Sequence, residues 1–173
     1  VKVDLERDVP PVMADPVQAE QVLLNLLINA RDAMCGTGAI EVSVGLEDYA
    51  GVACASCRKR VQGRFVTLAV CDSGSGIAPE ALDRIFEPFF TPKGVRKGSG
   101  MGLSTVHGIV HECGGHVTVD STPGAGAGCS RWPRGVSGRP SSPSITTRPP
   151  WPAPRTFAVG SVDGIGDVVD ELR

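Results

Sequence analysis

Two glycine clusters give the chain a pattern of residues that could bind a nucleotide. The first is Asp72-Ser73-Gly74-Ser75-Gly76-Ile77, and the second is Gly98-Ser99-Gly100-Met101-Gly102-Leu103. Glycine lets a backbone approach a ligand closely, and the amide groups at the start of a helix bind phosphate. The chain has no Gly-Lys dipeptide, which excludes the P-loop, and Pro79 stands where the dinucleotide fingerprint needs its third glycine. The clusters therefore indicate another kind of nucleotide pocket.

A polar stripe on a predicted helix supplies side chains that such a pocket would need. Asp15 and Pro16 predict the start of a helix that runs to about Met34. Along one face its polar residues recur three or four positions apart: Gln18, Gln21, Asn25, Asn29 and Asp32. Asparagine is a mediocre residue inside a helix, and a solvated face would normally carry Glu and Lys. The stripe therefore favours a binding role over a solvated surface.

The remaining periodicity predicts an α/β fold around these motifs. Strands are predicted at 1–5, 40–46, 65–72 and 116–120. Short helical turns are expected at 79–86, a second helix at 101–113, a polar loop at 47–63 and a mobile loop at 87–98. The strand at 65–72 delivers Asp72 directly into the first glycine cluster.

Composition narrows the class of protein. A chain of 173 residues, 41% of them hydrophobic, can bury one ordinary core. A formal net charge of −2 gives no reason to expect nucleic acid as a partner. No apolar run approaches the roughly 18 residues of a membrane span, and the first residues are charged rather than apolar. We therefore expect a cytoplasmic domain without membrane contact of its own, whether or not a parent protein is membrane-anchored.

The sequence does not predict a metal site among the cysteines and histidines. Cys54-Ala55-Ser56-Cys57 has no second cysteine pair at zinc-finger spacing, so reduced loop thiols are favoured over metal ligands. His107 and His111 lie one helical turn apart, but with no third ligand in view a surface or packing role is favoured.

Taken in order, the motifs resemble the ATP-binding catalytic domain of bacterial sensor histidine kinases. This domain is part of a superfamily with type II topoisomerase, Hsp90-type chaperone and mismatch-repair ATPases. The resemblance covers about residues 1–126 and comprises an N box at 21–33, a G1 box at 72–77, an F box at 86–90 and a G2 box at 98–103. It implies a two-layer α/β sandwich, with a mixed, mainly antiparallel sheet packed under about three helices.

The resemblance also implies roles for individual residues. Asn29 matches the asparagine that binds the Mg²⁺ of the nucleotide, and Asn25 stands where hydrolytic members keep a glutamate as general base. Asp72 matches the aspartate that accepts a hydrogen bond from the adenine amine, so ATP is expected over GTP. Lys93 matches a basic residue near the terminal phosphate. The implied catalytic residues are Asn25, Asn29 and Lys93. The implied nucleotide-binding residues are Asn29, Asp32, Asp72, Gly74, Gly76, Ile77, Lys93, Gly98, Ser99, Gly100, Met101, Gly102 and Leu103.

The implied activity is transfer of the γ-phosphoryl group of Mg-ATP to a histidine on a separate dimerisation domain, with a response regulator as a further partner. His111-Glu112 lies at a helix end and is not expected to be the acceptor, which we expect on another polypeptide segment. The alternatives are a non-catalytic or damaged nucleotide-binding fragment and another ATPase or serine kinase of the superfamily. Asn25 in place of glutamate counts against the ATPase.

The composition changes after about residue 126. Seven of the 14 prolines lie between Pro133 and Pro154, and no Asp or Glu occurs at 121–161. Such a segment cannot build a core. The family's final apolar strand is expected near residue 127, but Ala127-Gly128-Cys129-Ser130 does not resemble it. We therefore expect a domain at 1–126 and an irregular or disordered tail at 127–173, and we hypothesise a shifted reading frame or artificial junction near residue 127.

Overall fold

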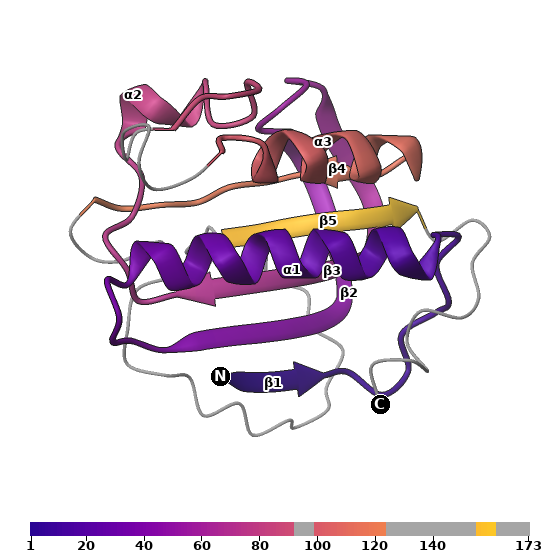
Figure 1. Ribbon diagram of the computed structural model, residues 1–173. Coiled ribbons are helices and arrows are strands. Elements are labelled where there is room, and N and C mark those ends of the chain that lie inside the picture. Colours follow the sequence, from indigo (N-terminus) through magenta and orange to yellow (C-terminus); the bar gives the residue numbers. More distant parts are fainter. Residues whose placement is uncertain (92–98, 124–154, 162–173) are drawn as a thin grey trace.

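Helices on one face of a mixed sheet make up the architecture (Figure 1). The computed structural model describes residues 1–91, 99–123 and 155–161. Its five strands lie in the order β1-β2-β3-β5-β4, with β1 parallel to β2 and the other pairs antiparallel. The predicted α/β class, with a mainly antiparallel sheet and three helices, is confirmed.

The first helix, α1 (Pro16–Ala33), forms as its sequence predicts. The Asp15 carboxylate accepts a hydrogen bond from the amide of Val17 at 2.8 Å, and Pro16 occupies the first turn. The helix ends before Cys35 and Gly36, which adopt positive φ angles of 52° and 104°. Its buried residues recur at helical spacing: Val22, Leu26, Ala30 and Ala33.

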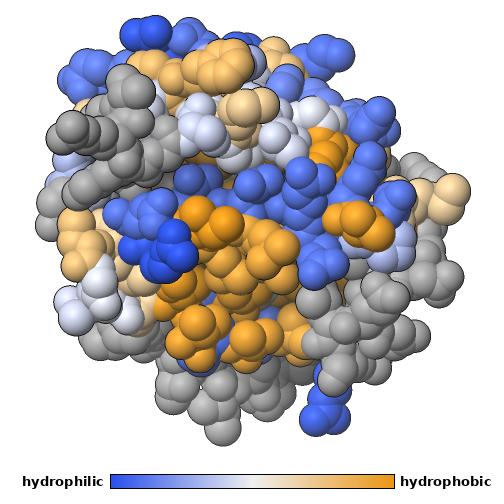
Figure 2. All heavy atoms as spheres, viewed as in Figure 1, coloured by the Kyte–Doolittle hydropathy of each residue, from blue (hydrophilic) through white to orange (hydrophobic). Residues whose placement is uncertain are grey.

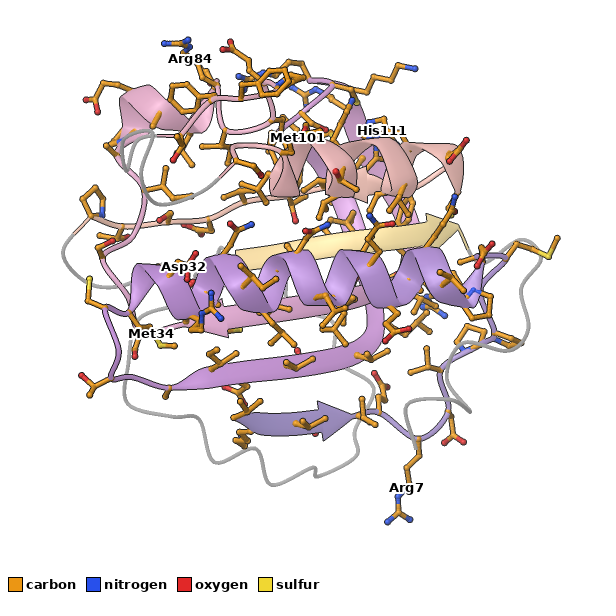
Figure 3. The ribbon with its side chains drawn as sticks, viewed as in Figure 1. Arg7, Asp32, Met34, Arg84, Met101 and His111 are labelled. Carbon is orange, nitrogen blue, oxygen red and sulfur yellow. The ribbon has the colours of Figure 1, made fainter. Side chains whose placement is uncertain are left out.

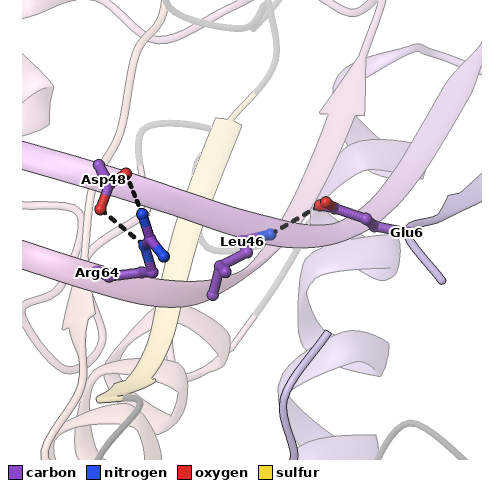
Figure 4. A network of polar contacts seen from close by, with 4 residues as sticks. All are labelled: Glu6, Leu46, Asp48 and Arg64. Carbon is purple, nitrogen blue, oxygen red and sulfur yellow. Dashed lines mark hydrogen bonds and ion pairs between the residues drawn. The ribbon is translucent and has the colours of Figure 1, made fainter. Parts of the chain in front are cut away.

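A long hairpin replaces the polar loop predicted at 47–63. β2 (Ile40–Ala53) and β3 (Arg60–Asp72) both extend into that range and leave only residues 54–59 as the turn between them. Polar residues on one side pair across the strands, and the Arg64 guanidinium donates to the Asp48 carboxylate at 3.0 and 3.1 Å (Figure 4). On the buried side the rings of Tyr49 and Phe65 meet edge to face, 5.7 Å apart. The prediction was wrong because polar residues that pair across two strands look, in the sequence alone, like the polar residues of a loop.

The other elements place two helices near one another above the sheet. β1 (Lys2–Leu5) is anchored at its end by Glu6, whose carboxylate accepts a hydrogen bond from the amide of Leu46 at 3.0 Å (Figure 4). α2 (Pro79–Leu82) and α3 (Gly102–Glu112) fall inside the predicted helical ranges, while β4 (His116–Val117) is shorter than predicted. The start of α1 lies close to the end of α3, where Nε2 of Gln18 donates a hydrogen bond to the Glu112 carboxylate at 3.4 Å.

One apolar core joins α1, α3 and the sheet. Its most deeply buried side chains come from all three: Val22, Val70, Val106, Val110 and Val117. Apolar atoms also gather on the outer surface of the face that carries α1 (Figure 2). On that helix Leu24 and Ile28 keep 49% and 45% of their surface exposed. Among the described helices, none is long and apolar enough to cross a membrane.

β5 (Arg155–Ser161) corrects the prediction that the whole segment 127–173 is irregular. This strand lies between β3 and β4, with Phe157 opposite both Leu68 and Val117. Its sequence includes Thr, Phe and Val, which favour strands, and it supplies backbone partners to two strands at once. The prediction failed because β5 is only seven residues long and follows a Pro-rich segment, whose composition is typical of irregular structure. The remainder of the predicted tail, the boundary at residue 126 and the proposed junction lie outside the described residues.

The buried face of α1 can be tested with two leucines of the same helix. Leu26 is 3% exposed in the core, so Leu26→Ala is expected to lower the free energy of unfolding by about 2 to 5 kcal/mol. Leu24→Ala, at a position 49% exposed, should change it by less than about 1 kcal/mol. Urea titration followed by circular dichroism measures both. Equal losses would contradict this orientation of the helix.

Candidate nucleotide site

The first glycine cluster lies against the end of α1. Asp72, at the end of β3, is 2% exposed, and its carboxylate accepts a hydrogen bond from the amide of Gly74 at 2.9 Å. The amide of Ser75 donates to the carbonyl of Ala33 at 3.0 Å. A Cβ atom at Gly74 would come within 2.6 Å of the Ala33 carbonyl carbon, so only glycine permits this contact. The loop after β3 therefore packs directly on the end of α1.

Gly76 and Ile77 fix the far side of this loop. Gly76 has a positive φ of 69°. The amide of Ile77 donates to the Ser121 hydroxyl at 2.7 Å, and the Ile77 side chain is buried in the core. The loop is thus held at both ends while the carboxylate of Asp72 stays at its base.

The second glycine cluster meets the polar stripe of α1. A Cβ atom at Gly102 would lie 3.4 Å from Nδ2 of Asn29 and 3.5 Å from Oδ1 of Asn25. Both asparagines therefore face the first turn of α3. Nδ2 of Asn29 is buried and has no hydrogen-bond partner in the described part of the chain. A buried amide without a partner is costly, which marks this position as one that a ligand would satisfy.

Among the described residues, no side chain caps the start of α3. The Ser99 hydroxyl accepts a hydrogen bond from the amide of Met101 at 3.4 Å, and Leu103 packs against the core. Unpaired amides at a helix N-terminus bind anions, with support from the helix dipole. This end of α3 has the chemistry that phosphate requires.

The F box holds the second cluster in place from the other side. The amide of Phe89 donates to the carbonyl of Gly100 at 3.0 Å. Gly100 has a φ of +67°, and a Cβ atom there would lie 2.5 Å from the Phe89 carbonyl carbon. Phe86 is buried and Phe90 packs against the core, whereas the side chain of Phe89 is 74% exposed. Two of the three phenylalanines of this segment thus hold it against the core.

The remaining predicted site residues differ in their placement. Asp32 lies on α1 and Met101 at the start of α3, on the same side of the molecule (Figure 3). Oδ1 of Asp32 pairs with the guanidinium of its neighbour Arg31 at 2.9 and 3.1 Å. Lys93 and Gly98 lie outside the described residues. The structure therefore brings Asn25, Asn29 and Gly102 together.

Comparison with known proteins identifies the domain. A family model described as histidine kinase-, DNA gyrase B-, and HSP90-like ATPase matches residues 14–133. The chain belongs to this family. The resemblance inferred from the four sequence motifs is thereby confirmed, and the histidine kinase-like ATPase domain extends over both glycine clusters and the polar stripe of α1.

Sensor kinases are among its relatives. Sensor kinase CckA of Brucella abortus is 44% identical over 126 residues, which are 73% of this chain and 13% of that protein. Sensor histidine kinase ZraS of Escherichia coli K12 is 41% identical over 123 residues, 71% of this chain and 23% of ZraS. The chain thus spans less than a quarter of either relative. A solved catalytic domain of histidine kinase ThkA matches with a TM-score of 0.50 and 30% identity over 68% of each chain.

A second cluster of polar side chains brings together cysteines and histidines that are far apart in the sequence. Cys54, Cys57, His111 and His116 place their ligand atoms within 4.8 Å of one another. His111, near the end of α3, therefore has the further ligand neighbours that the sequence did not reveal (Figure 3). Burial and the nearby His107 and His116 lower the pKa of His111. Each pair has zinc-like spacing on its own, and only the fold shows that the pairs meet.

Two glycines near the site test the close approach of its segments. Gly100→Ala places a side chain at a φ of +67° and against the Phe89 backbone, so it should lower the free energy of unfolding by about 1 to 3 kcal/mol. Gly108→Ala is the matched control, since Gly108 lies within α3 with nothing within 4 Å of the added atom. It should raise stability by about 0.5 to 1 kcal/mol. Thermal unfolding checks both, and a stable Gly100 variant would refute the contact.

Proposed function

We propose that this domain binds Mg-ATP and donates the γ-phosphoryl group to a histidine on a separate dimerisation domain. The observation that supports this most directly is the position of Asn25 and Asn29 against the first turn of α3, which no side chain of the described residues caps. Oxygen ligands and phosphate-binding amides would there meet in one place. The sensor kinases among the relatives support the same activity.

Asp72 would select the base. It is a buried carboxylate at the end of β3, held by the amide of Gly74. A carboxylate oxygen accepts a hydrogen bond from the exocyclic amine of adenine, whereas guanine presents a carbonyl oxygen there. Two facing acceptors would leave a buried polar group unpaired, at a cost of about 1 to 3 kcal/mol. ATP is therefore the proposed nucleotide, with Gly74, Gly76 and Ile77 forming the wall beside the base.

The phosphates would lie between α1 and α3. Asn29 is the proposed metal ligand, because its neutral amide oxygen suits a Mg²⁺ ion that takes most ligands from water and phosphate. When bound, Mg²⁺ supplies neutralisation of charge on the triphosphate. The amides of the second glycine cluster would bind the phosphates, with Gly98, Ser99 and Gly100 leading into Met101, Gly102 and Leu103. Lys93 would add a positive charge near the γ-phosphate, and Asp32 would lie at the edge of the pocket.

Asn25 favours transfer to a histidine over hydrolysis. An amide does not take a proton from water at neutral pH, so Asn25 would not serve as a general base. In the proposed reaction a histidine ring nitrogen attacks the γ-phosphorus, the bond to the bridging oxygen of the β-phosphate breaks, and ADP leaves with that electron pair. The domain would contribute position and charge stabilisation. A response regulator would accept the phosphoryl group afterwards, and the reaction would take place in the cytoplasm.

Calorimetric titration tests the nucleotide pocket. The chain should bind ATP more tightly than GTP, and Mg²⁺ should strengthen ATP binding. Asp72→Asn replaces a carboxylate, which only accepts hydrogen bonds, with an amide that also donates them, and it should weaken ATP binding by at least about tenfold. Asn29→Ala should remove the effect of Mg²⁺, while Glu20→Ala, on the exposed surface of the same helix, should change neither. Undiminished binding in both site variants would refute the assignment.

Phosphotransfer distinguishes a kinase from an inert binding domain. The chain is mixed with γ-labelled ATP, Mg²⁺ and a separately purified dimerisation domain from a sensor kinase relative. Acid-labile label on the histidine of that domain is the expected result, and Asn29→Ala should abolish it. Tight ATP binding without transfer to several such domains would instead favour the non-catalytic alternative. Rapid release of free phosphate would favour the ATPase.

A further inference from the structure

Four sulfur and nitrogen ligands meet at the opposite end of α3 from the nucleotide site. Cys54 and Cys57 lie in the turn between β2 and β3, His111 near the end of α3, and His116 at the start of β4. Cys54 and His111 are 57 positions apart in sequence, and Cys57 and His116 are 59 apart. Three separate elements therefore contribute to one cluster, which is independent of the proposed kinase activity.

The distances suit a single tetrahedral ion. Sγ of Cys54 lies 3.9 Å from Nε2 of His111, and Sγ of Cys57 lies 3.8 Å from Nδ1 of His116. Bonds of about 2.3 Å to sulfur and about 2.0 Å to nitrogen place such atoms about 3.5 Å apart around tetrahedral zinc. Each histidine thus offers one specific ring nitrogen to a common centre. Only small adjustments would close the four atoms around an ion.

The local backbone holds the two thiols on the same side. The amide of Cys54 donates to the carbonyl of Lys59 at 2.8 Å, and the amide of Arg58 donates to the carbonyl of Cys54 at 3.0 Å. Arg58 takes a φ of 64°, which is unusual for a residue other than glycine. The turn is fastened to β4 by the amide of Ala55, which donates to the carbonyl of Val117 at 2.7 Å. Each pair of ligands is held by secondary structure before any ion binds.

The surroundings favour a closed, structural site. Cys54 is completely buried, beside the small core of Tyr49, Val61 and Phe65. Two thiolates and two neutral imidazoles around a divalent zinc ion have no net charge, which suits a buried position. Four protein ligands leave no coordination position for a substrate. The spacings C-x2-C and H-x4-H also agree with those of structural zinc sites.

We propose that Cys54, Cys57, His111 and His116 bind a structural Zn²⁺ ion that fastens the β2–β3 hairpin to α3 and β4. The ion would join the tip of the hairpin to the main core through four bonds. Oxidation of Cys54 and Cys57 to a disulfide is the competing state for the same sulfurs, and it would leave both histidines without a ligand role. The two states are distinguished by metal content and thiol count.

Metal analysis of the full chain is the first test. The protein is purified without a metal-affinity tag, in reductant, after growth with zinc, and its metal content is measured by mass spectrometry. About one zinc per chain is expected, with both thiols reduced. After chelation, Co²⁺ alone should restore visible bands of tetrahedral cobalt and a thiolate charge-transfer band. Zinc removal should lower the melting temperature by about 5 to 10 °C.

Paired variants test the ligands. Cys57→Ser and His116→Gln should each weaken zinc binding by more than about tenfold, measured by competition with a chromophoric chelator. Cys35→Ser and His107→Gln, which alter the same residue types outside the cluster, should retain one zinc. If the ligand variants do not fold, the cobalt spectrum of the unaltered chain decides. Absence of zinc and of tetrahedral cobalt bands in the reduced chain, a Cys54–Cys57 disulfide in its place, or equal losses in the control variants would overturn the proposal.

Discussion

The site depends on two positions that carry no side chain. Gly74 lets the loop after β3 contact the end of α1, and Gly100 contacts the F-box backbone, next to the turn where Gly102 faces Asn25 and Asn29. With Cβ atoms at Gly74 and Gly100 the segments would have to separate, since these atoms would lie less than 3.0 Å from neighbouring backbone. Close packing of backbone on backbone, rather than any single polar pair, therefore places the functional side chains.

The sequence predicts α1 and the family well because their signals are local. Asp15, Pro16 and a regular apolar stripe specify the helix within 18 residues. The length of the hairpin was not predictable in the same way, since pairing between Asp48 and Arg64 becomes visible only once the strands are aligned. The strand at 155–161 was hidden for a related reason, because its pairing partners β3 and β4 are distant in sequence.

The two clusters of functional groups are connected by one short helix. α3 has 11 residues, with Gly102 at the asparagines of α1 and His111 at the cysteines of the hairpin. At about 1.5 Å per residue, the nine positions between Gly102 and His111 separate the two clusters by roughly 14 Å along the helix axis. Fixing the end of α3 would therefore also limit the movement of its first turn, on which the phosphate-binding amides depend.

The place of β5 in the sheet has a consequence for how the chain folds. β4 pairs only with β5 among the described strands, and β5 in turn completes the hydrogen bonding of β3. During synthesis β4 leaves the ribosome well before its partner and has no neighbouring strand until residues 155–161 follow. Closing so long a loop has an entropic cost and slows the pairing of distant strands. The sheet is therefore completed late, and until then its central strand β3 is an open edge that another chain could pair with.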